Sequence, residues 1–322
     1  MSVLVFAESS EGKFKKIALE VTSYGKKIAE ELNTNCEVLT INANDTSILA
    51  NYGADKIIKV TDEKLQTFNA KAFANVIKQV AEKTNASVIV IDSSANGIYL
   101  APIVAVNLAA GYASKVIAEP SSTSPFTVKR QAFSNKAFCS TEITTAKKVI
   151  GLAKNSFGLF ENNSNATEES FTASLTDTDF GISSTAVETS AGTVTIADAD
   201  IVVSGGRGLK GPENWGMVEE LAEVLGAATA CSKPVSDLGW RPHSEHVGQT
   251  GKPVAANLYI AIGISGAIQH LAGINSSKVK VVINTDPEAP FFKAADYGIV
   301  GDAFEVVPQI IEKLKEFKAQ NA

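Results

Sequence analysis

The sequence predicts a two-domain α/β protein, and three observations support this prediction. Short apolar runs alternate with longer segments whose apolar residues recur every three or four positions, the pattern of parallel strands joined by helices. The chain has 322 residues, more than one hydrophobic core usually spans. Hydrophobic residues make up 45% and charged residues 20%, as in globular proteins. We therefore expect two domains, each a mostly parallel sheet flanked by helices.

Strands and helices alternate along the first 110 or so residues. Strands are predicted at 2–7, 36–41, 56–60 and 87–91. Helices are predicted at 14–32, 69–83 and 98–109. In the first helix, Ile17, Val21, Tyr24 and Ile28 share one face, which indicates a buried side. This alternation implies right-handed crossovers and a mostly parallel sheet.

The middle of the chain changes character. Short β-like runs between residues 115 and 159 are expected to extend the first sheet. Residues 161–200 are rich in Ser, Thr, Asn and Asp, with one alternating run near 184–189, and indicate a connection that carries one edge strand. We place the boundary near residues 190–198, which gives an amino-terminal Rossmann-like domain at 1–195 and a second domain at 196–322.

The second domain repeats the strand and helix pattern. Strands are predicted at 201–203, 258–262, 280–284 and 297–301, and helices at 213–225 and 306–317. Asp286, Pro287 and Glu288 resemble a helix start, with aspartate as N-cap and proline in the first position. The second domain is therefore expected to be doubly wound.

Charge, cysteine content and hydropathy exclude several classes of protein. A net charge of −6 argues against a general nucleic-acid binder. The three cysteines are too scattered for a disulfide framework, so a reducing compartment, the cytoplasm, is expected. No apolar run approaches the roughly 18 residues that span a bilayer, so the protein is not expected to be membrane-embedded.

Two groups of polar residues have both a functional and a structural interpretation. The loop at 92–97 follows a predicted sheet strand, where α/β proteins bind ligands, but a capped helix start is the favoured interpretation. His243 and His246 form an H-x-x-H pair near Cys231, but they lack a matched second pair of ligands, so no metal site is predicted. Nothing resembles a Ser/His/Asp arrangement, and no catalytic residue is predicted.

Three glycine-rich turns lie within about 65 residues of the second domain, at 204–209, 247–252 and 264–270. The first and third each follow a predicted strand and precede a helix. Such turns can present backbone N–H groups and a helix N-terminus to phosphate, or they can be tight connections only. The spacing of the first turn departs from the G-x-G-x-x-G dinucleotide fingerprint. Taken together, the three turns favour a phosphate-bearing cofactor.

These turns belong to a longer series of motifs, SGGRGLKGPENW, VGQTGK, AIGISGAIQHLAG and INTDPEAPFFKAADYGIVGD. In this order they closely resemble the carboxyl-terminal half of the electron-transfer flavoprotein alpha subunit. The first 190 or so residues match that family only loosely, through the opening SVLVFAE. The resemblance implies that the second domain binds FAD without a covalent link, and that the first domain has a nucleotide-binding fold but does not hold the flavin.

The resemblance also assigns residues to parts of the cofactor. It implies that Arg207 and Ser232 contact FAD, that Thr250 lies near N5, that Ser265 lies near the pyrophosphate and that His270 lies near the C2 carbonyl. The full set implied for the cofactor is Arg207, Ser232, Lys233, Val247, Gly248, Gln249, Thr250, Ser265, Gly266, Ala267, Ile268, Gln269, His270, Asn284, Asp302 and Ala303. The last three match positions of the adenosine half.

The sequence departs from the family pattern at Lys233, where many members carry arginine over the flavin ring. Lysine keeps the positive charge but lacks the planar stacking surface and the fork of donors. This substitution affects the expected redox tuning rather than the expected fold or cofactor. A lysine here could also be a solvated loop charge, since Pro234 could redirect the loop.

The resemblance implies an electron carrier rather than an enzyme. The family is a heterodimer with a beta subunit that carries AMP, and it takes electrons from flavin dehydrogenases such as the acyl-CoA dehydrogenases of fatty acid beta-oxidation. It passes them towards a membrane quinone reductase. By residue chemistry alone, two other functions stay open: a stand-alone nicotinamide-dependent oxidoreductase, and an interaction module whose glycine turns are structural.

Overall fold

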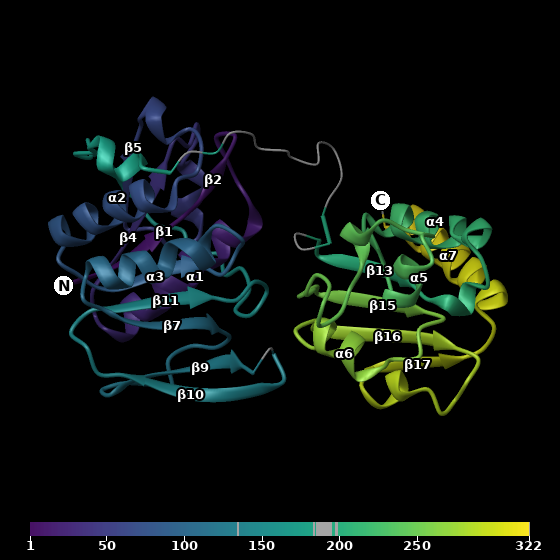
Figure 1. Cartoon of the computed structure of the whole chain (residues 1–322). Coiled ribbons are helices and arrows are strands. Elements are labelled where there is room, and N and C mark those ends of the chain that lie inside the picture. The colour runs from purple at the N-terminus through teal and green to yellow at the C-terminus, as the bar shows by residue number, and fades with distance from the viewer. Residues whose placement is uncertain (134, 183, 185–194, 197–198, 322) are drawn as a thin grey trace. The chain divides into compact units, whose positions relative to one another are not determined.

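A computed structural model of the chain describes residues 1–133, 135–182, 184, 195–196 and 199–321. The chain divides into two compact units, the first comprising residues 1–132 and 137–187 and the second residues 133–136 and 188–322 (Figure 1). The boundary proposed at residues 195 and 196 stays a prediction. The alternating run expected at 184–189 falls outside the described residues, apart from Ser184.

Ten strands of the described chain form one sheet in the first unit. In order across the sheet these strands are β10 (Ala137–Ile143), β9 (Phe126–Ala132), β7 (Gly111–Val116), β11 (Lys148–Leu152), β6 (Ala86–Asp92), β1 (Ser2–Phe6), β4 (Asn35–Ile41), β5 (Lys56–Val60) and β12 (Thr167–Ser170), with β8 (Ser122–Thr123) paired to β9. From β7 to β12 all neighbours are parallel, whereas β8, β9 and β10 pair antiparallel. The predicted mostly parallel sheet, extended by the short runs after residue 115, is confirmed.

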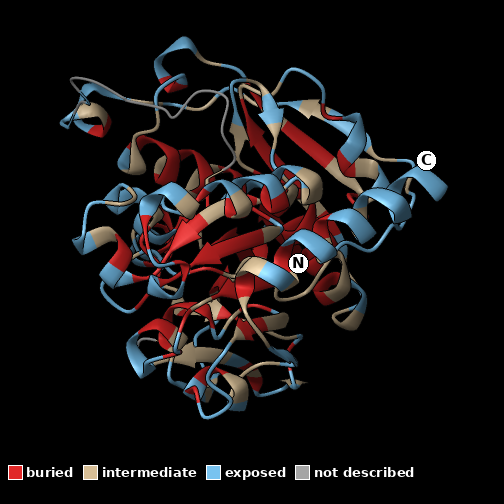
Figure 2. Cartoon of the chain, turned by 90° about the vertical axis from the view of Figure 1, so that its right-hand side faces the viewer, coloured by how far each residue is buried: buried red, intermediate tan, exposed pale blue. Residues whose placement is uncertain are grey.

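Helices cover both faces of this sheet because successive strand residues point to opposite sides. Val3 and Val5 of β1 pack in the core formed with α1 (Lys16–Glu31). Leu4 and Phe6 pack in the core formed with α2 (Ala70–Lys83) and α3 (Gly97–Asn107). Figure 2 shows buried residues along the strands and exposed ones on the outer sides of helices.

The polar loop at 92–97 holds the start of α3 through local hydrogen bonds. The Asp92 carboxylate accepts from the Ser94 backbone N–H at 2.9 Å, and the Ser94 hydroxyl oxygen accepts from the Gly97 N–H at 3.1 Å. Asn96 donates its amide to the Glu8 carboxylate at 2.6 Å. These contacts correspond to the capped helix start rather than to a prepared nucleotide site.

The second unit holds a parallel sheet of five described strands. Their order is β14 (Ala228–Cys231), β13 (Ile201–Gly205), β15 (Leu258–Ile262), β16 (Val279–Asn284) and β17 (Tyr297–Val300). Numbered along the chain, the order is 2-1-3-4-5, so the direction of winding reverses between β13 and β15. At such a reversal the loops after the two strands leave towards opposite faces, and a crevice opens beyond their carboxyl ends.

Helices cover both faces of the second sheet as well. α4 (Gly216–Leu225) and α7 (Ala303–Gln320) share one core, in which Val218 and Val307 contact the strands. On the other face, α6 (Ile268–Ile274) packs over Tyr259 of β15. The short helix α5 (Lys233–Asp237) follows β14. The doubly wound arrangement predicted from the sequence is confirmed.

The predicted helix start at Asp286 is wrong. The Asp286 carboxylate accepts from the Glu288 backbone N–H at 2.9 Å, which closes a local turn, and the next helical segment is the 3₁₀ turn η7 (Pro290–Lys293). An aspartate side chain bonded two residues ahead satisfies the same donor that a helix N-cap would satisfy. The sequence signal is therefore the same for a local turn and for a helix N-cap.

Glycines in the loops after β13 and β15 permit direct backbone contact between these loops. The Gly208 N–H donates to the Gly263 carbonyl at 3.0 Å. A Cβ on Gly208 would lie 2.6 Å from the Gly263 Cα, and a Cβ on Gly206 would lie 2.2 Å from the Gly263 oxygen. Gly263 also has a φ of +63°, which side-chain-bearing residues rarely adopt. Any side chain here would push the two loops apart.

We expect Gly208→Ala to destabilise the second unit by roughly 1–3 kcal/mol, the usual effect of overpacking. Gly216→Ala is the matched control, because a Cβ there meets no heavy atom within 4 Å, and alanine favours the helix. Urea unfolding followed by tryptophan fluorescence measures both, since Trp215 and Trp240 lie in this unit. Equal unfolding free energies for the two variants would contradict the contact.

Candidate functional site

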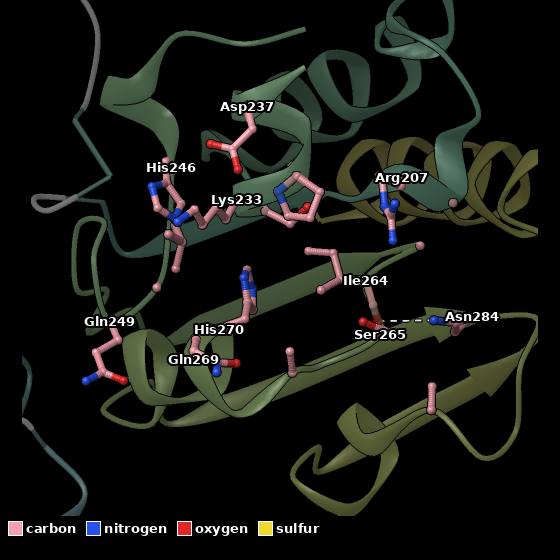
Figure 3. A pocket seen from close by; sticks show the side chains of 18 of the residues that line it. Arg207, Lys233, Asp237, His246, Gln249, Ile264, Ser265, Gln269, His270 and Asn284 are labelled. Atoms are coloured by element: carbon pink, nitrogen blue, oxygen red, sulfur yellow. Dashed lines mark hydrogen bonds between the residues drawn. The ribbon is translucent and has the colours of Figure 1, made fainter. Parts of the chain in front are cut away.

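A cavity of about 590 Å³ lies at the carboxyl ends of strands in the second unit. The loops that follow β13, β14, β15 and β16 all contribute to its wall, as the strand order requires. Figure 3 shows Arg207 pointing towards the loop of Ile264 and Ser265, and His270 pointing into the cavity from α6. The volume is within the range of about 300–1,000 Å³ that is common for cofactor sites.

Most residues that the sequence singled out line this cavity. They are Arg207, Ser232, Lys233, Val247, Gly248, Gln249, Thr250, Ser265, Ala267, Gln269, His270 and Asn284. They come from five segments of the sequence, at 207, 232–233, 247–250, 265–270 and 284. The folded sheet therefore brings the three glycine-rich turns to one place.

Four of the predicted residues are not among those that line the cavity. Gly266 packs against Phe291, whose backbone nitrogen would be 2.5 Å from an added Cβ. Ile268 is 71% exposed at the start of α6. Asp302 caps α7 by accepting from the Phe304 N–H at 3.0 Å, and Ala303 is buried in the core beneath that helix.

The cavity wall also includes residues that the sequence did not single out as cofactor contacts. These are Gly208, Pro234, Asp237, His246, Gly263, Ile264, Asp286 and Ala289. Each neighbours a recognised motif, so proximity in the sequence was the available signal. The sequence indicates His246 only as a member of the H-x-x-H pair, for which no metal site is predicted. Within the described residues, no group of three or more His, Cys, Asp or Glu side chains is arranged to hold a metal ion.

Both predicted helix N-termini are displaced along the chain. The turn after β13 leads into the 3₁₀ turn η4 (Arg207–Leu209), and α4 begins only at Gly216. After β15, α6 begins at Ile268 with Ala267 as its N-cap, two residues beyond Ser265. The loop backbone is held instead by Asn284, whose amide donates to the Ile264 carbonyl at 3.1 Å. The exposed Ser265 therefore faces the cavity from an extended loop.

Backbone hydrogen bonds fix the loop that contains Val247–Thr250. The Val247 N–H donates to the Cys231 carbonyl at 3.0 Å, and the Gln249 N–H donates to the Gln269 carbonyl at 2.8 Å. Gly248 has a φ of +152° and lies against Gly273, whose added Cβ would be 2.6 Å from the Gly248 Cα. The loop is thereby attached to both β14 and α6.

Charged side chains of both signs surround the opening of the cavity. Arg207 and Lys233 are exposed and line it, together with the acids Asp237 and Asp286. Burial lowers the pKa of His246, and the charges of His243 and Lys233 lower it further. Lys233 extends from α5 on the same side as His246 (Figure 3). Its positive charge therefore reaches the cavity wall rather than pointing away from it.

His270 is a buried ionisable group that faces the cavity, with 7% of its surface exposed. Its Nε2 lies 2.9 Å from the Tyr259 hydroxyl oxygen, whereas its Nδ1 is buried and makes no hydrogen bond to a described residue. Burial, with a smaller effect of the His246 charge, lowers the pKa of His270 to about 4. The ring is therefore neutral at pH 7, and one nitrogen needs a partner.

We expect the buried His270 to make the second unit less stable in mild acid. The unfolded residue takes up a proton near pH 6.5, but the folded one does so only near pH 4. Between these values the unfolded state binds more protons, so the unfolding free energy decreases as the pH falls from 6.5 towards 4. From pH 7 to pH 5 the loss from this residue is about 2 kcal/mol.

Urea unfolding at pH 7 and pH 5 tests this expectation. Between pH 7 and pH 5, the unfolding free energy of His270→Asn should decrease by about 2 kcal/mol less than that of the wild type. His243→Asn, which changes an exposed histidine of the same unit, should behave like the wild type. Identical pH dependence in His270→Asn and wild type would show that His270 does not remain neutral in the folded state.

Among the residues that the structure describes, no helix combines the length and apolar character needed to cross a bilayer.

Family models match both units of the chain. Residues 3–178 match the electron transfer flavoprotein domain, and residues 195–275 match the electron transfer flavoprotein FAD-binding domain. The second match contains most of the cavity-lining loops.

Curated relatives match nearly the whole chain. The electron transfer flavoprotein subunit alpha of Bacillus subtilis is 38% identical, and the alignment covers 98% of this chain and 97% of the relative. The electron transfer flavoprotein subunit alpha of Syntrophomonas wolfei is 35% identical, and the alignment covers 97% of this chain and 98% of the relative. A protein of Caenorhabditis elegans, described as a probable mitochondrial electron transfer flavoprotein subunit alpha, is 37% identical over 97% and 93%.

Proposed function

The chain belongs to the electron transfer flavoprotein alpha-subunit family, and from this premise we propose that the cavity of its second unit is where FAD binds. The family makes it an electron carrier with an FAD-binding domain. The observation that carries the proposal is the buried His270 Nδ1, a polar atom that makes no hydrogen bond to a described residue and lies at the wall of a cofactor-sized cavity. A carbonyl oxygen of the flavin would supply that partner.

Each part of the cavity wall has a role in this proposal. Arg207 and Ser265 would bind the pyrophosphate, since a guanidinium forms charge-assisted hydrogen bonds to phosphate. The loop with Gln249 and Thr250 would contact the polar edge of the ring, and Lys233 would supply a positive charge beside it. Asn284, Asp302 and Ala303 are proposed for the adenosine half, the last two from the resemblance alone.

Bound FAD supplies the redox chemistry, so this chain needs no acid, base or nucleophile of its own. Its residues bind the cofactor, orient it and set the charge around it. The fixed loops fit this task, because both the Gly208–Gly263 contact and the loop attached to α6 hold polar groups in place. Pre-organised groups bind a cofactor without an additional ordering cost.

We further propose the partners that the family implies. A beta subunit that carries AMP would form the heterodimer and complete the flavin site. Electrons would come from flavin dehydrogenases such as the acyl-CoA dehydrogenases of fatty acid beta-oxidation and leave towards a membrane quinone reductase. A cytoplasmic location is proposed because the chain's cysteines, Cys36, Cys139 and Cys231, are free thiols.

Co-expression with a beta subunit tests the proposed function directly. The purified complex should show flavin absorption bands without added cofactor, and a substrate-reduced acyl-CoA dehydrogenase should bleach them. A complex that forms but contains no flavin would contradict the proposed site. Flavin bands that no acyl-CoA dehydrogenase bleaches would leave FAD binding intact but contradict the proposed electron donor.

Ser265→Asp is expected to weaken FAD binding about a hundredfold, because a carboxylate beside a pyrophosphate costs several kcal/mol. Ser244→Asp is the control, since Ser244 is exposed in the same unit and does not line the cavity. Equilibrium dialysis of the flavin-free complexes against FAD measures both affinities. If Ser265→Asp binds FAD with the affinity of the wild type, Ser265 does not lie beside the pyrophosphate.

Lys233→Ala is expected to lower the reduction potential of the bound flavin, because a nearby cation stabilises the negative charge gained on reduction. The side chain is exposed, so the effect should be roughly 1 kcal/mol or less. Lys233→Arg should keep the potential, since it keeps the charge. Lys252→Ala, an exposed lysine outside the cavity wall, is the control for net charge.

Spectroelectrochemical titration of the four proteins separates the two interpretations of Lys233. If the potential of Lys233→Ala equals that of the wild type, the residue is a solvated loop charge.

A further inference from the structure

His246 is a second buried imidazole on the wall of the cavity. Only 1% of its surface is exposed, yet it is among the residues that line the cavity. Its Nδ1 is buried and makes no hydrogen bond to a described residue. Buried polar atoms in folded proteins almost always have a partner, and a missing partner costs free energy. The open nitrogen therefore indicates a ligand or a water molecule at this part of the wall.

The backbone that carries His246 is held on both sides. Its carbonyl accepts from the Lys252 N–H at 2.9 Å. The preceding residue, Glu245, accepts from the Arg241 Nε at 2.9 Å and from Nη2 at 2.7 Å. Arg241 also donates through Nη1 to Glu219 of α4 at 3.0 Å. The imidazole is therefore placed before any ligand arrives, which lowers the cost of ordering it on binding.

The His246 ring packs against the glycine-rich turn at 247–252. An added Cβ on Gly251 would lie 2.9 Å from the His246 Cγ, and one on Gly248 would lie 3.5 Å from its Nε2. Figure 3 shows His246 and Gln249 on one side of the cavity, away from Arg207. His246 therefore lies with the turn proposed to contact the polar edge of the flavin ring, rather than with the groups proposed for the pyrophosphate.

Charged groups from two neighbouring elements act on His246. Lys233 and Asp237 belong to α5, and His243 belongs to the 3₁₀ turn η6 (His243–Glu245). Burial lowers the pKa of His246, the His243 and Lys233 charges lower it further, and Asp237 opposes them. Imidazole ordinarily takes up a proton near pH 6.5, so this ring is neutral at pH 7. A neutral imidazole offers one donor and one acceptor, which suits the edge of a heteroaromatic ring.

We propose that His246 is a further cofactor-binding residue, which hydrogen-bonds the flavin ring from the β14 side of the cavity while His270 does so from α6. The inference rests on the proposed function, since the partner of the open nitrogen is taken to be FAD. His246 precedes the first residue of the VGQTGK motif and lies outside the set of residues implied by the resemblance. Two contacts from different elements restrict the orientation of the ring more than one contact does.

Nitrogen NMR of the histidine side chains shows whether FAD contacts His246. The full chain, labelled at its three histidines, is assembled with an unlabelled beta subunit, freed of flavin and titrated with FAD. His246→Asn identifies the His246 resonances. Imidazole nitrogen shifts respond strongly to hydrogen bonding, so FAD should move those of His246 and leave those of the exposed His243 nearly unchanged. Unmoved His246 resonances in a complex saturated with FAD would overturn the proposal.

His246→Phe removes both ring nitrogens and keeps a flat ring. We expect the FAD affinity of the complex to fall about 3- to 10-fold, as for one lost neutral hydrogen bond. The full chain without FAD should unfold at the same or a higher urea concentration than the wild type, because a buried atom without a partner has been removed. A variant that keeps wild-type affinity would contradict the contact.

His246→Asn separates a lost hydrogen bond from a packing defect. It keeps a polar atom near the position of Nδ1, so its FAD affinity should lie closer to that of the wild type than the affinity of His246→Phe does. If both variants lose affinity equally and unfold at lower urea concentrations, His246 has only a structural role. His243→Phe is the matched control, because His243 is exposed, lies beside the same ring and does not line the cavity. It should leave FAD affinity unchanged.

The same titration distinguishes a failure at His246 from a failure of the proposed function. A complex that binds no FAD contradicts the proposed function. A complex that binds FAD, with moved His270 resonances and unmoved His246 resonances, contradicts only the role of His246.

Discussion

The backbone contact between Gly208 and Gly263 is the constraint on which the rest of the second unit depends. Strand order reverses between β13 and β15, so the loops after these strands start side by side and leave towards opposite faces. Only residues without a Cβ let these loops touch. This contact places Arg207 and Ser265 on the wall of one cavity. A side chain at either glycine would push the two loops apart, so that one ligand could no longer contact both loops.

The same geometry separates two kinds of polar group around the cavity. Arg207 and Lys233 are exposed, so water screens their charges. Their side chains are also free to move towards an anionic ligand. His270 is buried, and burial keeps it neutral and makes an unpaired ring nitrogen costly. An electron carrier needs this division, because the flavin provides the chemistry and the protein provides binding, orientation and local charge.

The sequence predicted the regular elements well because their signals are local. The run at 56–60 forms β5, and the periodic face with Ile17 and Tyr24 is the buried side of α1. The three glycine-rich turns were recognisable from their glycines, and the first and third also from the strand runs that precede them. Their meeting at one cavity follows from parallel strands, which all present their carboxyl ends at one edge.

Other features required the three-dimensional structure. Asp286 and Asp302 have the same local pattern, in which the carboxylate accepts a hydrogen bond from the backbone N–H two residues later. Asp286 closes a turn in this way, whereas Asp302 caps a helix. Tyr259 lies in an apolar strand run, so its hydroxyl gave no sign of a partner eleven residues away. The contact between Tyr259 and His270 joins strand β15 to helix α6, and no local pattern in the sequence records it.

The most direct test of the account is an experimental structure of this chain assembled with a beta subunit and FAD. The account predicts that the flavin ring lies in the cavity of the second unit, with a ring carbonyl oxygen within hydrogen-bonding distance of the His270 Nδ1 and the pyrophosphate near Arg207 and Ser265. A flavin bound outside this cavity, or a ring whose carbonyl oxygens all face away from His270, would contradict it.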